Sequence, residues 1–596
     1  MAKMAKSKNF RKTSKQINEA KKFFQREKLV AISSDKTKKL VIENSNDITS
    51  RTEKILADSK TYKPIQKSRQ TSISKQANKI TKSFAKNLSK QDSLRLLTTG
   101  CRPAKFHALV KDHKDPDESG FPLRPIAAVN NTATEKVDWL VSQILGQLVQ
   151  FVPANLKNAD DLVEKLKMLD FSLLTEDHCF VSLDVVKLYP SIPIDFGIRA
   201  VLDMAELHWK DIDNFGASVD DLKRALSFVS YNYEIEFNGS VYLQKKGCPM
   251  GAHFAPPFAI ITLHKIESQA IQILTEKFDF KPQIFSRYID DVCFGPCVRD
   301  NDMFDKVLNV FNSINDSIQF TIEIPKVGQP LNFLDLSIIV VKQNIRFTWY
   351  TKECHSEIIL KPDSWLPRHV KLNFVANSVR QVAKKCSDSE MKSVALETLG
   401  RRLKSNGYNN INFEKILDRP RYPKKDEDCV FLQTNFINDR FNKRINQIVH
   451  QYNFPVKIIS KPNKKLSQCF RDTLIKTKHE NCNTCRSLPD NYNCNDRFIV
   501  YKFKCNICLK FYIGETCRPF HQRFEEHKRS LLANDKKSAL SDHVFNHHPN
   551  EDLDLSNFQL CVLASCRNPV ETRLKEAQLI AECRPQLNRR HELTQW

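Results

Sequence analysis

The sequence predicts a multidomain α+β protein, and three observations support this fold class. The chain has 596 residues, a length that favours roughly three or four domains over a single core. Between residues 96 and 375, short apolar runs typical of strands alternate with longer runs typical of helices. The two ends differ in composition, because Lys and Arg are concentrated near the N-terminus and Cys near the C-terminus.

Residues 1–95 are predicted to form a basic arm that is partly disordered. They hold 25 Lys and Arg against 8 Asp and Glu, so 25 − 8 = +17 of the formal charge of +24 lies in this segment. A Lys-rich segment with few aromatic side chains buries little apolar surface, and it attracts polyanions such as nucleic acids. A solvating tail is the alternative interpretation.

The next segment, 96–375, carries acidic residues at the ends of two strand-like runs. Asp184 lies in FVSLDVV, and Asp290 and Asp291 follow SRYI. Carboxylates in an apolar strand are costly to bury unless a cation neutralises them, and Mg²⁺ prefers one or two protein carboxylates together with substrate phosphates. The acids therefore predict a two-metal site for phosphoryl transfer. Adjacent acids in a solvent-facing turn are the alternative.

The motifs around these acids resemble the palm of reverse transcriptases. Tyr-Ile-Asp-Asp follows a strand-like run, with an Asp-x-x-x-x-Tyr upstream, and LVKDHK, PLRPIAA, KKGCPMGAHFAPPFA and LNFLDLSI occur in that family's order. The resemblance implies fingers and palm over 96–375. It also implies that Asp184 and Asp290 bind two Mg²⁺ ions, with Asp291 as a supporting neighbour.

The same resemblance implies which residues contact the substrate. Arg124 would contact the incoming triphosphate, and Tyr189 would screen the 2′ position of its sugar. Gly251 lies in the segment that passes beneath the nascent base pair in that family. Lys111 is either a phosphate contact or a solvated charge.

Two less informative segments follow. Residues 376–460 show amphipathic helices without catalytic motifs, and the resemblance implies a thumb-like region there. Residues 461–496 begin with KPNKKLS and are predicted to be a linker that contains a Cys-rich zinc knuckle.

The last segment, 497–596, resembles the GIY-YIG nucleases, a family with a small α/β domain. Val500-Tyr501 stands where the first half of the signature belongs, although Ile499 replaces its glycine, and Tyr512-Ile513-Gly514 reproduces the second half. Arg523 and His527 are spaced i and i+4, which places them on one helix face. The run LKEAQLIAECRPQLN resembles the family's metal-binding helix and closing asparagine.

This second resemblance implies a DNA-nicking site. Tyr501 or Tyr512 would supply or orient the nucleophile, Arg523 would stabilise the developing charge, and Glu576 would bind one Mg²⁺. Glu571 competes with Glu576 for the metal, but Glu576 has the better register. The residues implied to contact or support the substrate are Gly514, His527 and Asn588.

Cysteine pairs in the C-terminal region predict zinc. In a chain without a secretory signal, C-x-x-C pairs favour metal thiolates over disulfides. Cys505 and Cys508 need two further ligands, and DHVFNHH offers His543 with His547 or His548, while His527 is a possible substitute. A second zinc site is predicted from His479, Cys482, Cys485 and Cys494. Free thiols are the alternative at both places.

A reverse transcriptase followed by a GIY-YIG nuclease with inserted cysteines resembles the Penelope-like retroelements, whose reverse transcriptase is akin to that of telomerase. The resemblance covers about residues 100–596 and implies target-primed reverse transcription, in which a nicked DNA end primes copying of an RNA template. The expected partners are template RNA, target and primer DNA, and dNTPs, with nuclear localisation and no membrane. The oligomeric state is left open. The alternatives are a telomerase-like polymerase and a domesticated RNA-binding protein.

Overall fold

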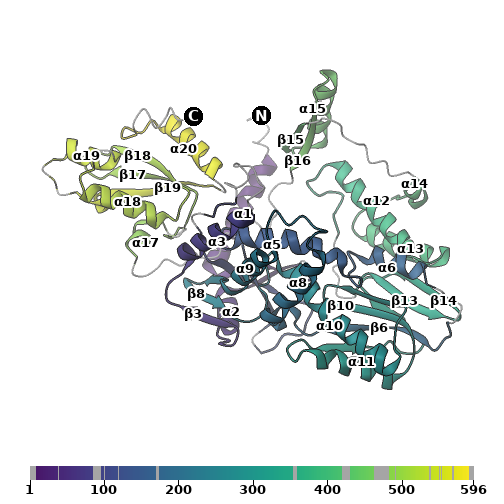
Figure 1. Cartoon of the computed structure of the whole chain (residues 1–596). Helices are drawn as coiled ribbons and strands as arrows, with labels where there is room; N and C mark the ends of the chain where they lie inside the picture. The colour runs from purple at the N-terminus through teal and green to yellow at the C-terminus, as the bar shows by residue number, and fades with distance from the viewer. Residues whose placement is uncertain are drawn as a thin grey trace. The chain divides into compact units, whose positions relative to one another are not determined.

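The structure is a computed structural model of the whole chain (Figure 1). The chain forms two compact units, Met1–Asp472 and Thr473–Trp596, which are described separately. The residues described are 8–37, 39–84, 96–98, 101–118, 120–169, 174–352, 359–418, 430–461, 482–489, 492–494, 496–535, 538–549, 551, 553–566 and 569–588. Among these residues, no helix is both long enough and apolar enough to cross a bilayer.

The first unit contains a four-stranded antiparallel sheet in the order β11-β6-β10-β9. Its strands alternate apolar residues toward two cores, as a sheet buried on both faces requires. One face packs against helices α10 and α11, and the other against helix α6 and the three-stranded sheet β12-β13-β14 (Figure 1). The strands of the central sheet are β6 (His178–Val185), β9 (Ile284–Tyr288), β10 (Asp291–Val298) and β11 (Phe320–Glu323). The elements packed on it are α6 (Ala159–Lys167), α10 (Ala255–Phe278), α11 (Asn301–Ile314), β12 (Leu331–Phe333), β13 (Leu336–Val341) and β14 (Asn344–Trp349).

A five-stranded sheet in the order β3-β8-β7-β4-β5 lies in the same unit. Only the β4–β7 pairing is parallel. Its buried residues belong to the same core as α10, so the two sheets form one body. The strands are β3 (Tyr62–Ile65), β4 (Ala104–Val110), β5 (Leu123–Ala128), β7 (Glu234–Phe237) and β8 (Ser240–Gln244). The helices around them are α3 (Gln70–Phe84), α5 (Glu135–Leu148), α7 (Leu188–Ser191), α8 (Ile194–His208) and α9 (Val219–Tyr231).

The prediction of a separate, partly disordered arm over 1–95 was wrong for residues 29–84. Strand β3 pairs with β8, and Ile73, Ala77 and Phe84 of α3 are buried in the main core. These residues are four and seven positions apart and give α3 one apolar face, which the overall Lys content of the segment concealed. The preceding elements are α1 (Lys8–Arg26), β1 (Leu29–Ser33), β2 (Leu40–Asn44) and α2 (Ser45–Leu56).

The region predicted as a thumb over 376–460 contains a helical pair followed by a small β-α-β module. Helix α12 begins at Arg368, earlier than expected, and packs on α13 through a valine, leucine and alanine core. The module consists of two strands paired in parallel with one helix between them. The elements are α12 (Arg368–Lys384), α13 (Ser389–Ser405), α14 (Phe413–Leu417), β15 (Val430–Asn435), α15 (Asp439–Gln451) and β16 (Val456–Lys461).

The second unit is built on a three-stranded antiparallel sheet in the order β18-β17-β19. Helices α18 and α19 cover the face that carries Tyr501 and Phe503, whereas α20 packs on the opposite face at Val500 and Ile513. The elements are α17 (Asn483–Ser487), β17 (Ile499–Cys505), β18 (Phe511–Thr516), α18 (Phe520–Leu532), α19 (Ala539–His547), β19 (Phe558–Ser565) and α20 (Pro569–Cys583). Much of the predicted linker, including His479, lies outside the described residues.

Candidate functional site

The structure brings the three predicted acids of the first unit together. Strands β6 and β10 run antiparallel, with Asp184 directly opposite Asp291. Asp290 precedes Asp291 in the two-residue connection between β9 and β10. Directly paired residues in an antiparallel sheet have Cβ atoms about 5 Å apart. Segments that are distant in sequence therefore present a compact group of carboxylates at one edge of the sheet.

The electrostatics of this group fit a divalent cation. Partial burial and then the charge of Asp290 raise the pKa of Asp184. Burial, Asp290 and Asp184 raise the pKa of Asp291 to about 6. These shifts show that the carboxylates lose solvation and repel one another. Oxygen ligands that repel one another are the set that Mg²⁺ binds, because the cation removes that repulsion.

Three lysines offset part of this negative charge. The charges of Lys352, Lys36 and Lys114 lower the pKa of Asp184 against the effects of burial and Asp290. Lys352 follows strand β14, Lys114 follows β4, and Lys36 follows β1. The sequence analysis missed Lys36, which it assigned to a solvated arm. The available signal was the strand-like run LVAIS just before it, which marks a folded segment.

The two-residue connection that contains Asp290 is strained, and a buried arginine donates a hydrogen bond to it. Ile289 has φ +57°, a left-handed conformation that is unfavourable for a β-branched residue. Arg287 is fully buried and donates a hydrogen bond from its guanidinium to the Ile289 carbonyl at 3.0 Å. The same guanidinium forms an ion pair with buried Glu267 of α10 and donates to the Ile260 carbonyl at 2.9 Å. Arg287 therefore joins the turn that contains Asp290 to helix α10.

The predicted cations Arg124 and Lys111 lie close together. The guanidinium of Arg124 on β5 is 3.2 Å from a carboxylate oxygen of Asp35. Burial, and then the charges of Arg124 and Lys114, lower the pKa of Lys111. Arg124 and Lys114 thus act on Lys111 as neighbouring positive charges, and a group of cations of this kind suits a phosphate chain.

Tyr189 and Gly251 belong to one packed corner. Burial raises the pKa of Tyr189 to about 12, and its carbonyl accepts a hydrogen bond from the Cys248 N–H at 2.7 Å. Gly251 has φ +126°, and a Cβ there would lie 2.2 Å from the carbonyl oxygen of Ala127 on β5. The absence of a side chain at Gly251 is thus explained by a close approach to β5, rather than by the predicted substrate contact.

In the second unit, Tyr501 stands at the centre of a hydrogen-bonded group. Its hydroxyl accepts from Arg523 Nε at 3.0 Å and lies 2.8 Å from His527 Nε2. Because an arginine nitrogen only donates, the hydroxyl proton of Tyr501 is free to be donated to His527. Burial, and then the charge of Arg523, lower the pKa of His527 to about 3, so the imidazole is neutral and can accept it.

Gly514 makes room for both predicted tyrosines. It lies directly opposite Tyr501 on the paired strands, and a Cβ there would come within 2.8 Å of the hydroxyls of both Tyr501 and Tyr512. The carboxylate of Glu576 on α20 contributes to the raised pKa of Tyr501, after burial and Tyr512. The structure therefore brings Tyr501, Tyr512, Arg523 and Glu576 to one place. Glu571 is exposed at the start of α20, where its charge contributes to the raised pKa of Cys566, after burial.

Two of the residues predicted to contact the substrate, His527 and Asn588, form hydrogen bonds within the second unit. His527 is buried, and its Nε2 lies 2.8 Å from the Tyr501 hydroxyl. The side-chain amide of Asn588 accepts from the Ile513 N–H at 2.9 Å and donates to the Ile513 carbonyl at 2.7 Å. These two hydrogen bonds join Asn588 to β18, next to Gly514.

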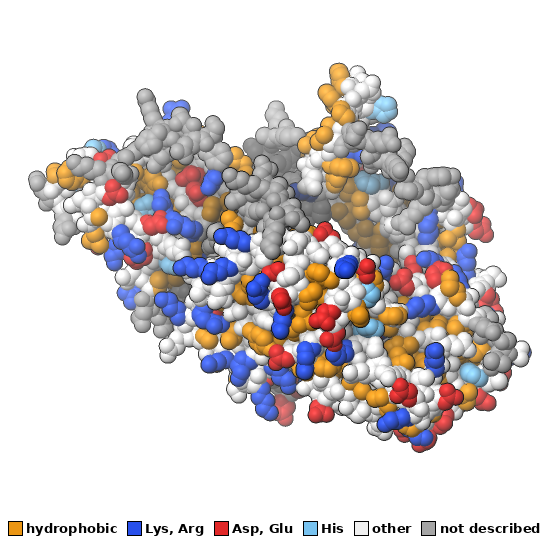
Figure 2. All heavy atoms as spheres, viewed as in Figure 1, with side chains coloured by type: hydrophobic (Ala, Val, Ile, Leu, Met, Phe, Trp, Pro, Cys, Tyr) orange, Lys and Arg blue, Asp and Glu red, His pale blue; other side chains and the backbone are white. Residues whose placement is uncertain are grey.

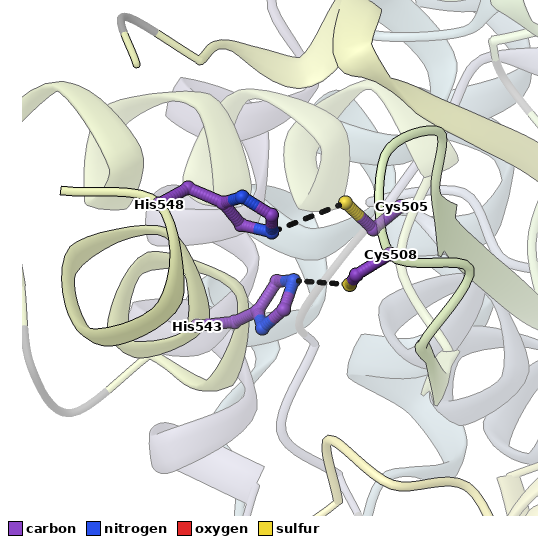
Figure 3. Close-up of side chains that lie close together, drawn as sticks. All are labelled: Cys505, Cys508, His543 and His548. Carbon is purple, nitrogen blue, oxygen red and sulfur yellow. Dashed lines mark hydrogen bonds between the residues drawn. The ribbon is translucent and has the colours of Figure 1, made fainter. Parts of the chain in front are cut away.

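Four ligand atoms gather beside the β17–β18 turn, where Cys505 and Cys508 face His543 of α19 and His548 just after it (Figure 3). The His548 Nε2 to Cys505 Sγ distance is 3.8 Å, and the His543 Nε2 to Cys508 Sγ distance is 3.4 Å. Neighbouring ligands of a tetrahedral zinc ion are separated by about 3.6 Å, so this cluster fits zinc. His547 is exposed outside the cluster, and His527 is bound to Tyr501, so neither is a ligand here.

A second group contains Cys482, Cys485 and Cys494, whose sulfur atoms lie within 4.8 Å of one another. The Cys494 N–H donates to the Cys485 sulfur at 3.3 Å, a contact that stabilises a thiolate. Three thiols fit a metal that takes a fourth ligand. The predicted fourth ligand, His479, lies outside the described residues.

Comparisons with known proteins give distant structural likenesses. No family model and no curated protein sequence matches the chain. A telomerase from Candida albicans, solved with a fragment of telomeric RNA, matches at TM-score 0.44 and 12% identity over 65% of this chain and 65% of that chain. Apo telomerase from Candida tropicalis matches at 0.39 and 12%, over 66% and 70%. The RNA-dependent RNA polymerase of a human picobirnavirus matches at 0.37 and 12%, over 68% and 81%. The chain thus spans just under two thirds of the Candida albicans telomerase, and at these scores its function must follow from its own residues.

The Arg287→Met variant should separate the two roles of this arginine. Because Glu267 would be left buried without a counter-charge, we expect a loss of about 3–5 kcal/mol in the free energy of unfolding, measured by urea denaturation. The double variant Arg287→Met with Glu267→Leu should recover most of that stability. It should still bind Mn²⁺ weakly in electron paramagnetic resonance titrations, because the Ile289 carbonyl stays unanchored. Full recovery of Mn²⁺ affinity in the double variant would show that Arg287 only neutralises Glu267.

The Cys508→Ser variant should lose one zinc ion per chain in elemental analysis. Because the metal would join the β17–β18 turn to α19, its loss should lower the melting temperature of the second unit. Cys583→Ser is the matched control, since Cys583 is exposed on α20 and belongs to neither cluster. Equal zinc content in the two variants would rule out this site.

Proposed function

We propose that the chain is an RNA-directed DNA polymerase of the reverse transcriptase type, joined to a DNA endonuclease. The polymerase proposal rests on the placement of Asp184 opposite Asp291, with Asp290 in the strained turn and lysines around these acids. Two Mg²⁺ ions bound there would lower the pKa of a primer 3′-hydroxyl and neutralise the leaving pyrophosphate. Asp184 and Asp290 would hold the ions, and Asp291 would support them.

The residues around the acids would bind and select the nucleotide. Arg124, Lys111 and Lys114 form the positive patch for the triphosphate, and Lys36 adds a charge close to the carboxylates. Tyr189 lies within the field of Asp290 in a buried corner. A bulky ring at that place would exclude a 2′-hydroxyl and so favour dNTPs. These contacts support the use of dNTPs, and we propose RNA as the template.

The second unit would cut DNA. The neutral His527 accepts a hydrogen bond from the Tyr501 hydroxyl, which orients the Tyr501 oxygen beside Arg523. Because Tyr501 is fully buried, we propose that it orients an attacking water and that Tyr512 lies nearer the scissile phosphate. Arg523 would stabilise the charge that develops on the phosphate. Glu576 would hold one Mg²⁺.

Both sites on one chain support target-primed reverse transcription by a Penelope-like retroelement. The nuclease would expose a DNA 3′-hydroxyl, and the polymerase would extend it along an RNA template in the nucleus. A telomerase-like enzyme would need the polymerase alone, and it gives no reason for the grouping of Tyr501, Arg523 and Gly514. The zinc clusters would fix the nuclease hairpin and the segment before it.

The two activities should be separable by single substitutions. Asp290→Asn should lower RNA-templated primer extension by about 10²-fold or more and spare nicking, because it removes a ligand of the metals at the reacting phosphate. Glu576→Gln should do the reverse on supercoiled plasmid. The full reaction would combine plasmid, template RNA, dNTPs and Mg²⁺, with cDNA covalently joined to a nicked end as the product. If each variant kept both activities, the assignment of the two sites would be wrong.

The Lys36→Ala variant should bind dNTPs less well. Removing a cation near the triphosphate should raise the KM for dNTP about tenfold, with little change in kcat, because the contact is present before and during reaction. Lys39→Ala is the matched control, since Lys39 is exposed in the same segment. Steady-state primer extension at varied dNTP concentration measures both constants. Equal KM values in the two variants would remove Lys36 from the site.

A further inference from the structure

The β15–α15–β16 module, residues 430–461, has almost no core of its own. Among its residues only Phe436 is buried. Trp365 holds the module to the start of α12, because its indole N–H donates to the Phe436 carbonyl at 3.3 Å and its ring packs on Phe436. Asp439 accepts from the Arg368 N–H at 2.8 Å. A two-stranded sheet is marginally stable by itself, and parallel strands are normally covered on both faces.

Among the residues that the structure describes, helix α15 packs over one face of this sheet, although Val430 and Leu432 on that face remain 65% and 52% exposed. Directly paired residues of parallel strands share a face, and Asn442 of α15 donates to Ser460 at 2.7 Å. Helix α15 therefore lies on the face that contains Ser460 and its partner Thr434. The opposite face is formed by the other alternate residues of the two strands: Phe431, Gln433, Asn435, Lys457, Ile459 and Lys461.

The open face has the chemistry of a surface that binds single-stranded nucleic acid. Phe431 is 55% exposed and Ile459 is 42% exposed, so an aromatic ring and an aliphatic side chain face solvent. Lys457 pairs with Phe431 and Lys461 with Asn435, and no acid lies on this face. Such surfaces combine aromatic rings, on which bases stack, with cations that follow the phosphates. Hydrophobic side chains also gather on the visible surface of this module in Figure 2.

The charge of the module favours nucleic acid over a protein partner. Arg440, Lys443, Arg444, Lys457 and Lys461 stand against Asp439 alone, a net charge of 5 − 1 = +4. A second copy docked through the same face would gather four lysines, two from each copy, in one interface, because a two-fold interface joins identical patches. Like charges directly opposite each other are destabilising.

We propose that the open face of the β15–α15–β16 module is a binding site for single-stranded nucleic acid, in which Phe431 stacks on a base and Lys457 and Lys461 contact phosphates. The strand is either template RNA or a single DNA strand, which share this chemistry. The site is independent of the polymerase and nuclease sites, and it binds without metal ions at those sites or dNTPs. Its failure would leave the proposed catalytic function untouched.

The test uses the full chain with Asp290→Asn in every variant, without Mg²⁺ or dNTPs. Fluorescence anisotropy reports binding of a short unstructured RNA, the DNA of the same sequence, and the RNA duplex. Phe431→Ala should weaken single-strand binding about tenfold, because it removes one stacking contact, and should leave the salt dependence unchanged. Lys457→Gln with Lys461→Gln should reduce the slope of log affinity against log salt by about 1.4, since each phosphate contact contributes about 0.7.

The matched control is Lys443→Gln with Arg444→Gln, which removes the same charge from exposed positions of α15. This control should change the slope by less than the sheet variant does, and the affinity for duplex RNA should be unaffected by Phe431→Ala.

A loss of affinity of Phe431→Ala for single-stranded RNA alone, for single-stranded DNA alone or for both supports the site and identifies the strand that it binds. Unchanged single-strand affinity in Phe431→Ala, or equal slopes in the sheet and control variants, would overturn it. A variant that alters the sedimentation coefficient but not RNA affinity would mark a protein interface instead and would also overturn it.

Discussion

The first unit is organised around the repulsion between carboxylates at one edge of its central sheet. Strand register brings Asp184 and Asp291 opposite each other, and the turn before β10 adds Asp290. Nothing local favours this arrangement, because like charges on directly paired residues oppose strand pairing. It persists because both faces of the same sheet are buried in large apolar cores. Packing of the two cores thus keeps the carboxylates close together although their charges repel one another. A cation that binds between them would remove this repulsion.

The second unit buries the hydroxyl of Tyr501 and gives it a hydrogen-bond partner on each side. Tyr501 has no exposed surface, and its hydroxyl lies between Arg523 and a neutral His527. The i, i+4 spacing on α18 sets both partners at once, while Gly514 leaves the space that the phenol occupies. The cysteine and histidine cluster lies at the far end of the same hairpin. A metal there would fix the hairpin against α19, and through it the register that places Tyr501 over Gly514.

The sequence predicted what is local and missed what depends on packing. Asp184 and Asp290 were found because an acid at the end of an apolar strand is unusual within a short window, and Arg523 and His527 because helix periodicity is local. Arg287 and Glu267 were missed, because a buried ion pair across twenty positions has no pattern in the sequence. Lys36 and the folding of residues 29–84 were missed for the opposite reason, since a strong charge pattern concealed a weaker apolar one. The choice of His548 over His547 depends on where α19 ends, which spacing alone left open.

The two sites also differ in how much of the chain each requires. The residues that act on Asp184 come from four places, after β1, β4, the β9 turn and β14, so the carboxylate site exists only when distant segments have packed. The residues grouped around Tyr501 lie on two strands of one small sheet and on the helices α18 and α20 that pack on it. Because contacts distant in sequence carry a larger loop-closure cost, the first site depends on cooperative packing of the whole first unit. The second unit can instead form its site from local pairings, with metal as the added constraint that a small core needs.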